Sequence, residues 1–174
     1  MLIAGAKCDV CSLGRVCKAE QSFTPVLAET HKNDRVVFVG DFPGTHEELE
    51  GRPFVGPAGR VLQAAMETTG LKREECLLSY TMACRPPMNR LDIFSVQHTR
   101  ANKARKKKGK ELLLSPQVAC RDRLLKEIWG ATNIICMGTE AMRTLRGGTA
   151  SITSMRGACQ ELDLPWGKVK VAYT

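Results

Sequence analysis

The stretch Gly40-Asp41-Phe42-Pro43-Gly44, together with the block Gly51-Arg52-Pro53-Phe54-Val55-Gly56-Pro57-Ala58-Gly59, decides how this chain folds. It comes directly after an apolar run that is typical of a β-strand, Arg35-Val36-Val37-Phe38-Val39. It leads into a run that is typical of a helix, Arg60 to Thr69. A strand, a glycine-rich corner and a helix N-terminus together make a crevice with exposed backbone N–H groups, where α/β proteins usually hold an anionic ligand.

The rest of the chain repeats this alternation of strands and helices. Three more apolar runs predict strands at 76–80, 133–137 and 168–173, and helix-compatible segments lie at 58–69, 115–129 and 139–145. Ser115-Pro116 is a good helix start, because serine caps a helix N-terminus and proline suits the first helical position. The alternation predicts an α/β fold with a mostly parallel sheet covered on both faces.

Right-handed crossovers place the carboxyl ends of parallel strands on one rim of the sheet. We expect that rim to carry Asp41, Tyr80, Gly138 and Thr174.

Length and composition predict a single domain over residues 1–174. The chain is 43% hydrophobic, which is enough for a sizeable core. Its formal net charge of +8 favours an anionic partner such as nucleic acid, although a generally basic protein without such a partner is the alternative. No apolar run is long enough to span a bilayer, and 1–7 is too short and too mixed for a signal peptide. We therefore expect a cytoplasmic protein that does not bind membranes.

Residues 90–114 interrupt the pattern as a basic insertion. Between Arg100 and Lys110 there are seven basic residues and no acidic one. Like charges repel one another, so we expect a mobile loop. Such an arm would contact DNA phosphates without sequence preference, whereas the alternative is a solubilising insertion with no partner. The candidate DNA contacts are Arg100, Arg105, Lys106, Lys107, Lys108 and Lys110.

Eight cysteines in a reducing compartment suggest metal or cluster ligation rather than disulfides. Cys8 and Cys11 form a C-x-x-C pair, Cys84 precedes Arg-Pro-Pro, and Cys120 lies in the helix predicted after Ser115. Four thiolates suit a structural zinc ion as well as an iron–sulfur cluster. The other four are interpreted as ordinary buried or partly buried thiols, with Cys17 an alternative ligand: Cys17, Cys76, Cys136 and Cys159.

The glycine-rich block resembles the first motif of the family 4 uracil-DNA glycosylases, the iron–sulfur branch of their superfamily. The resemblance runs from Cys8 to about Tyr173 and is interrupted only by the basic insertion. It implies the three-layer α/β sandwich of that superfamily. It also implies a structural [4Fe–4S] cluster on the cysteines that match the family's ligands, Cys8, Cys11, Cys84 and Cys120.

The same resemblance implies a base-binding pocket. Asp41 stands where the family has the glutamate of Gly-Glu-Ala-Pro-Gly, and Glu47 matches a second acidic position, so both are predicted to be catalytic. Phe54 matches the aromatic residue on which the base stacks. For Asp41 taken alone, a turn or N-cap carboxylate is the alternative. The predicted base-binding residues are Gly40, Phe42, Phe54 and Tyr80.

Two departures from the family bear on activity. Tyr80 replaces an asparagine whose amide reads the uracil edge, and a phenol lacks the amide's paired donor and acceptor. The family's His-Pro loop would begin after the fourth strand, where this sequence stops at 172–174; either the chain is a fragment or it lacks that histidine. We expect His31, His46 and His98 to be surface or loop residues.

Three hypotheses follow. The first is a DNA-repair glycosylase, an N-glycosyl hydrolase that flips uracil out of DNA and excises it, with Tyr80 and the absent His-Pro loop arguing against full activity. The second is an impaired or inert DNA-binding module, a replication accessory or a domain of a larger protein. The third is the same pocket adapted to another base or nucleotide. In each the expected partner is DNA, single- or double-stranded, and the expected state is a monomer.

Overall fold

The computed structural model describes residues 3–19, 24–31, 36–149 and 151–174. Five strands form one sheet: β1 (Val36–Gly40), β2 (Cys76–Tyr80), β3 (Asn133–Met137), β4 (Cys159–Leu164) and β5 (Gly167–Tyr173). Arg35, predicted to begin the first strand, lies outside the described residues. The helices are α1 (Ser12–Ala19), α2 (Thr45–Glu50), α3 (Pro57–Thr69), α4 (Leu91–Lys107), α5 (Pro116–Glu127), α6 (Thr139–Arg146) and α7 (Ile152–Met155), with two 3₁₀ turns, η1 (Arg73–Glu75) and η2 (Pro87–Asn89).

The strand order is β2-β1-β3-β5-β4. The first four strands in that order run parallel, and β4 pairs with β5 in the antiparallel direction. The mostly parallel sheet and the four predicted strands are confirmed. The β4 strand was missed, because residues 159–164 alternate polar and apolar side chains at an exposed sheet edge and carry no continuous apolar run.

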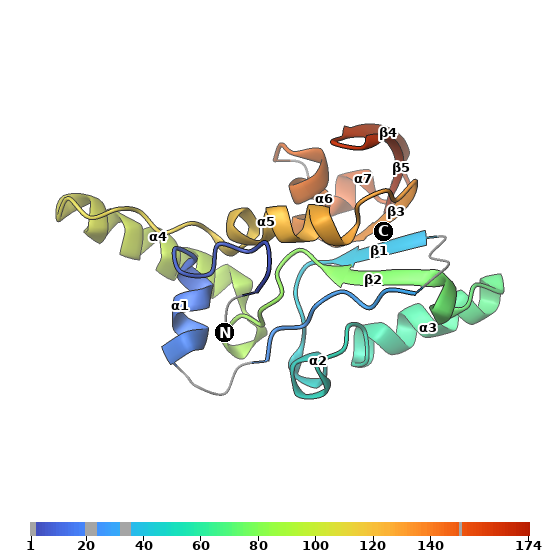
Figure 1. Cartoon of the computed structure of the whole chain (residues 1–174), viewed down its shortest axis with the longest axis horizontal. Coiled ribbons are helices and arrows are strands. Elements are labelled where there is room, and N and C mark those ends of the chain that lie inside the picture. The colour runs from blue at the N-terminus through green and yellow to red at the C-terminus, as the bar shows by residue number, and fades with distance from the viewer. Residues whose placement is uncertain (1–2, 20–23, 32–35, 150) are drawn as a thin grey trace.

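The sheet is the middle of three layers (Figure 1). Alternate residues of β1 point to opposite faces, as the pleat of a strand requires. Val37 and Val39 pack against α5 and α6, whereas Phe38 packs against α3 through Leu62 and Met66. The predicted three-layer sandwich is therefore confirmed.

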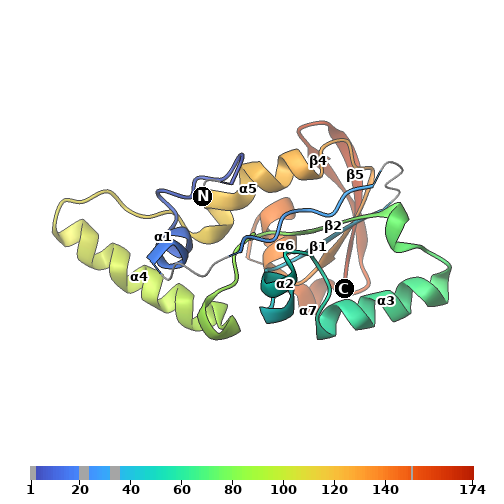
Figure 2. The same cartoon turned by 60° about the horizontal axis from the view of Figure 1, so that its bottom comes forward.

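A third apolar cluster lies where α1, α4 and the start of α5 meet, at one end of the molecule (Figures 1 and 2). Leu13, Phe94 and Ala119 contribute one buried side chain each from these three helices. The N-terminal segment is tied to this end by backbone hydrogen bonds, from Lys7 N–H to the Ala119 carbonyl and from Ser12 N–H to the carbonyl of Leu114.

The prediction of a mobile loop at 90–114 is wrong for most of its length. Residues 91–107 form α4, a single helix of 17 residues that extends away from the sheet (Figure 1). Lysine, arginine and alanine are good helix formers, and the basic last turn suits the negative end of the helix dipole. The Asn102 amide also fixes the segment that follows α4, because it donates to the Leu113 carbonyl and accepts from Leu113 N–H, each at 2.9 Å.

Candidate functional site

The glycine-rich corner lies at the rim that the sequence predicts. Gly40 ends β1 and is paired with Tyr80 of β2 on one side and with Met137 of β3 on the other. The backbone then joins the two neighbouring strand ends, since Thr81 N–H donates to the Gly40 carbonyl and Met82 N–H to the carbonyl of Asp41. The corner therefore sits at the carboxyl end of three parallel strands.

A pocket of about 410 Å³ opens at this corner, within the size range of small-molecule sites. It brings together all six residues predicted for catalysis or base binding, namely Gly40, Asp41, Phe42, Glu47, Phe54 and Tyr80. Four further residues complete the lining: Gly44, Pro57, Ala58 and Met137. Met137 was missed, although its place at the end of a predicted strand on the same rim could have indicated it.

Asp41 lies between the pocket and the first turn of α6. Its Oδ1 accepts a hydrogen bond from Ala141 N–H at 2.9 Å. Gly138 makes room for it: this residue has φ 132°, and a Cβ there would lie 2.5 Å from the carboxylate carbon. The pKa of Asp41 is raised to about 6, chiefly by burial; the N–H of Ala141 opposes this rise and the charge of Glu140 contributes to it. Asp41 thus lines the pocket and also caps a helix.

Glu47 is a buried bridge between two loops. Its Oε2 accepts from Gly44 N–H at 3.0 Å, and its Oε1 accepts from Gly56 N–H at 2.7 Å. A Cβ at Gly44 or Gly56 would lie less than 3.0 Å from these oxygens, so both glycines are needed for the close approach. The carboxylate thereby holds the N-termini of α2 and α3 together.

Phe54 and Tyr80 form the aromatic wall of the pocket. Their ring centroids are 4.7 Å apart with the planes inclined at 31°. Phe54 N–H donates to the Tyr80 hydroxyl at 2.9 Å, and burial raises the pKa of that phenol. Phe54 has φ 51°, and Arg73 supports this unusual backbone by donating to the Phe54 carbonyl at 3.3 Å and to the Pro53 carbonyl at 2.6 Å.

A buried ion pair on α5 supports the end of β2. Arg123 of α5 is 1% exposed; it donates to the Tyr80 carbonyl, and to the Thr81 carbonyl at 3.0 Å. It also pairs at 2.6 Å with Glu127, which accepts from Ser79 Oγ at 2.6 Å. Sequence reasoning missed this network. Its signal is the basic and acidic pair at i and i+4 on the otherwise apolar face of the helix.

The four candidate ligand cysteines are all buried at the end of the molecule that holds α1 and α4. Burial raises the pKa of Cys11 to about 11, and Cys120 and Cys8 act on the same thiol. The pKa of Cys84 is raised by its hydrogen bond with Cys17 and by burial, with Cys120 and Cys11 as further neighbours. Cys8, Cys11, Cys84 and Cys120 therefore lie in one buried cluster, the cysteine compartment, together with Cys17, which is hydrogen-bonded to Cys84.

The local backbone at Cys11 suits a sulfur ligand. Gly14 N–H donates to Cys11 Sγ at 3.3 Å, and the Cys8–Cys11 turn is closed by Cys11 N–H on the Cys8 carbonyl at 3.3 Å. Among the residues that the structure describes, no three histidine, cysteine or acidic side chains are arranged to hold a single metal ion.

The remaining thiols agree with expectation in all but one position. Cys17, Cys76 and Cys136 are buried, as predicted. Cys159, predicted to be buried or partly buried, is exposed because it begins the edge strand β4.

The basic residues and the histidines lie away from the pocket lining. All six candidate DNA contacts, from Arg100 to Lys110, follow the outer half of α4 and the turn after it, and five are exposed whereas Arg105 is half-buried. His31 lies in a loop, and His46 and His98 lie on α2 and α4. In the described part of the chain, no helix is both long enough and apolar enough to cross a bilayer.

Comparison with known proteins shows which family this sequence matches. The sequence model of the Uracil DNA glycosylase superfamily matches residues 28–171. A type-4 uracil-DNA glycosylase of Thermotoga maritima is 33% identical over 135 residues, which cover 76% of this chain and 60% of that protein. The type-4 enzymes of Archaeoglobus fulgidus and Sulfurisphaera tokodaii are 37% and 43% identical over 83 and 76 residues, covering 39% and 34% of their lengths. The matched segments thus span less than two thirds of each relative.

Proposed function

Because the chain belongs to the uracil-DNA glycosylase superfamily, we propose that it is a DNA-repair glycosylase that flips uracil out of DNA and cleaves its glycosidic bond. The observation that carries this proposal is the pocket at the strand ends, where all six residues predicted for catalysis or base binding converge, five from 40–59 and Tyr80 from the end of β2. A glycosylase needs such a pocket because the target base must leave the stack before its bond to the sugar can be reached. We propose that it acts as a monomer in the cytoplasm.

Asp41 is the proposed catalytic carboxylate. Cleavage of the glycosidic bond develops positive charge on the sugar, which a nearby carboxylate stabilises, or the same carboxylate orients the attacking water. With a pKa near 6, Asp41 is mostly ionised at neutral pH, as either role requires. Glu47 is proposed to act on the same site chiefly by holding the loops at Gly44 and Gly56.

Phe54 is the proposed stacking surface for the base, and Tyr80 its proposed edge contact. The Tyr80 oxygen already accepts from Phe54 N–H, so its own proton is the group left to donate toward a ligand. A single O–H donor suits a carbonyl oxygen of uracil but cannot read a donor and an acceptor together. We therefore expect weaker discrimination between bases than an asparagine would give.

The cysteine compartment is the proposed site of a [4Fe–4S] cluster on Cys8, Cys11, Cys84 and Cys120. Four buried thiols match the ligand number of such a cluster. A structural zinc ion, the alternative, needs all four sulfurs about 2.3 Å from one point, and a cluster tolerates a wider spacing. When bound, the group would join the N-terminal segment to α5 and the loop after β2. Iron and sulfide analysis of the purified protein tests this assignment.

DNA-phosphate contact is the proposed role of the basic outer half of α4. Its exposed arginine and lysine side chains provide the cations that phosphates attract, and such contacts carry no sequence information. Both single- and double-stranded DNA are proposed partners.

A second candidate function is DNA binding without excision. It is favoured by the hydrogen bond between Tyr80 and Phe54 and by the two occupied oxygens of Glu47, which commit these groups to the fold. In this case the molecule would hold DNA as an accessory to replication or as one domain of a larger protein.

A uracil-excision assay on single- and double-stranded oligonucleotides separates the two candidates, with DNA binding measured on the same samples. Uracil release that is lost in Asp41→Asn supports the glycosylase. Salt-sensitive DNA binding without release supports the binding module. Absence of both binding and release refutes both candidates.

A further inference from the structure

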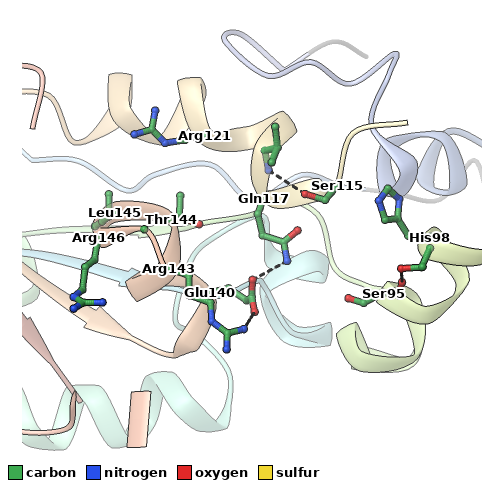
Figure 3. Close-up of a pocket in the computed structure, with 13 residues that line it drawn as sticks. Ser95, His98, Ser115, Gln117, Arg121, Glu140, Arg143, Thr144, Leu145 and Arg146 are labelled. Atoms are coloured by element: carbon green, nitrogen blue, oxygen red, sulfur yellow. Dashed lines mark hydrogen bonds and ion pairs between the residues drawn. The ribbon is translucent and has the colours of Figure 1, made fainter. Parts of the chain in front are cut away.

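A second, larger hollow lies between α4, α5 and α6 and has no part in the base pocket. Its volume is about 590 Å³. Figure 3 shows side chains of all three helices around it: Arg121 from α5, Arg143 and Arg146 from α6, and Ser95 and His98 from α4. The three arginines lie outside the basic insertion at 90–114, whereas Ser95 and His98 lie within it.

The hollow carries an excess of positive charge. Three arginines face one acidic residue, Glu140, whose carboxylate accepts from Gln117 Nε2 at 2.8 Å and lies 3.5 Å from Arg143. Among the described residues, neither Arg121 nor Arg146 forms an ion pair, and both are exposed. Two guanidinium groups are therefore available to an anion.

The remaining polar groups are also of the kind that binds phosphate. Thr144 places a hydroxyl group at the hollow, and Ser95 and Thr99 place two more, whose protons are donated in this structure to the carbonyls of Leu91 and Ser95. Arginine forks and hydroxyl donors are the groups that proteins use to contact the sugar–phosphate backbone of nucleic acids. An acidic peptide would find the guanidinium groups too, but the regular spacing of a phosphodiester chain suits a site spread over three helices.

Helix α6 connects the hollow with the base pocket. Asp41 caps the first turn of that helix by accepting from Ala141 N–H, and the hollow is lined from Glu140 to Gly147, the residue after the helix. At 1.5 Å per residue, Ala141 and Gly147 are about 9 Å apart along the helix axis. This distance is the axial rise of two to three nucleotides of one DNA strand.

On the other side the hollow continues onto α4. Ser95 and Thr99 lie one turn apart on the face that lines it, and the same spacing of four residues leads next to Lys103 and then to Lys107. Both lysines are exposed. Basic side chains thus lie both at the hollow, on α5 and α6, and along α4 toward its basic end.

We propose that the hollow between α4, α5 and α6 is a phosphate-binding track, in which Arg121 and Arg146 hold the backbone of the DNA strand beside the extruded nucleotide. This inference rests on the proposed binding of DNA. It assigns the contacts nearest the pocket to residues outside the basic insertion, and it gives α4 the role of extending the track.

The test uses the double variant Arg121→Gln/Arg146→Gln and measures its affinity for a labelled single-stranded oligonucleotide across a salt series. The matched control is Lys168→Gln/Lys170→Gln, which removes the same charge from exposed positions of β5, away from the hollow. Loss of two phosphate contacts lowers the salt slope by about 1.4 and weakens binding roughly 10- to 30-fold at 0.1 M salt. We expect the control to keep the wild-type slope.

Oligonucleotides with one neutral methylphosphonate at each position around the uracil locate the contact. We expect a position within two to three nucleotides of the uracil where neutralisation weakens the wild-type protein but not the double variant. The proposed track is overturned if the double variant has the same DNA affinity and salt slope as its control. It is also overturned if each neutral position weakens binding by the double variant as much as by the wild type. DNA binding without excision overturns only the glycosylase and leaves this comparison decisive, whereas no DNA binding by the wild type overturns both.

Discussion

Replacing Gly59 with alanine tests how the first turn of α3 fixes the aromatic wall. Alanine normally stabilises a helix relative to glycine by up to about 1 kcal/mol. Here a Cβ would lie 2.9 Å from Phe54 Cα and closer still to its carbonyl group, a separation that real Cβ atoms do not show. Phe54 cannot retreat freely, because its N–H is bonded to Tyr80 and its carbonyl to Arg73. Overpacking of this kind costs about 1–3 kcal/mol, and each neutral hydrogen bond lost adds about 1 kcal/mol.

Subtracting the helix gain leaves an expected net destabilisation of roughly 1–3 kcal/mol for Gly59→Ala, measured as the free energy of unfolding in urea. Ala64→Gly is the control, since Ala64 is exposed on the same helix and reports helix propensity alone. We expect the control to lose about 1 kcal/mol. If Gly59→Ala instead gains what Ala64→Gly loses, the close approach to Phe54 does not constrain the pocket and the reasoning is refuted.

Three further predictions concern the surroundings of the pocket. Tyr80→Phe removes the acceptor of the buried Phe54 N–H and should cost about 1–3 kcal/mol in urea unfolding; a change below about 0.5 kcal/mol, the size of a neutral surface substitution, would contradict the bond. Arg123→Met leaves Glu127 without its cation and the carbonyls of Tyr80 and Thr81 without this donor, and it should cost about 3–5 kcal/mol. Arg123→Met/Glu127→Met should recover part of that loss, and a double variant no more stable than the single one would argue against the buried pair. The pKa of Asp41 is raised on folding from 3.8 to about 6, so the folded state binds its proton more tightly and is stabilised as the pH falls through that window. Between pH 4 and pH 7 the wild type should therefore lose roughly 2 kcal/mol relative to Asp41→Asn, and parallel stability curves would show that this group is not perturbed.

Most of the fold could be predicted from the sequence, because three of its four parallel strands, β1, β2 and β3, are largely apolar runs, and in β5 apolar residues alternate with lysine. The block from Gly40 to Gly59 also identified five of the pocket residues, since its glycines and prolines permit only a narrow set of turns. The edge strand β4 could not be predicted in the same way, because an exposed edge needs no continuous apolar run. The helix α4 was not predicted, because the expectation that like charges repel and form a loop neglects helix propensity and the Asn102–Leu113 hydrogen bonds.

The parts of the site that sequence reasoning missed depend on contacts between distant segments. Arg123 acts on the end of β2 from 42 residues away, and neither partner carries a local motif. The arginines of the hollow come from two helices that only the tertiary structure brings together. For Asp41 the sequence offered two alternatives, a pocket carboxylate and a helix cap, and in the structure the residue is both.

The most direct test of the account is the single-turnover rate of uracil release measured from pH 4.5 to pH 8. If Asp41 serves the reacting nucleotide in its ionised form, the rate should rise with pH and level off above its pKa of about 6. Asp41→Asn should lose this rise together with most of the rate. Uracil release by Asp41→Asn at the wild-type rate, or no release by a DNA-binding wild-type protein at any pH, would contradict the claim that this corner is a glycosylase active site.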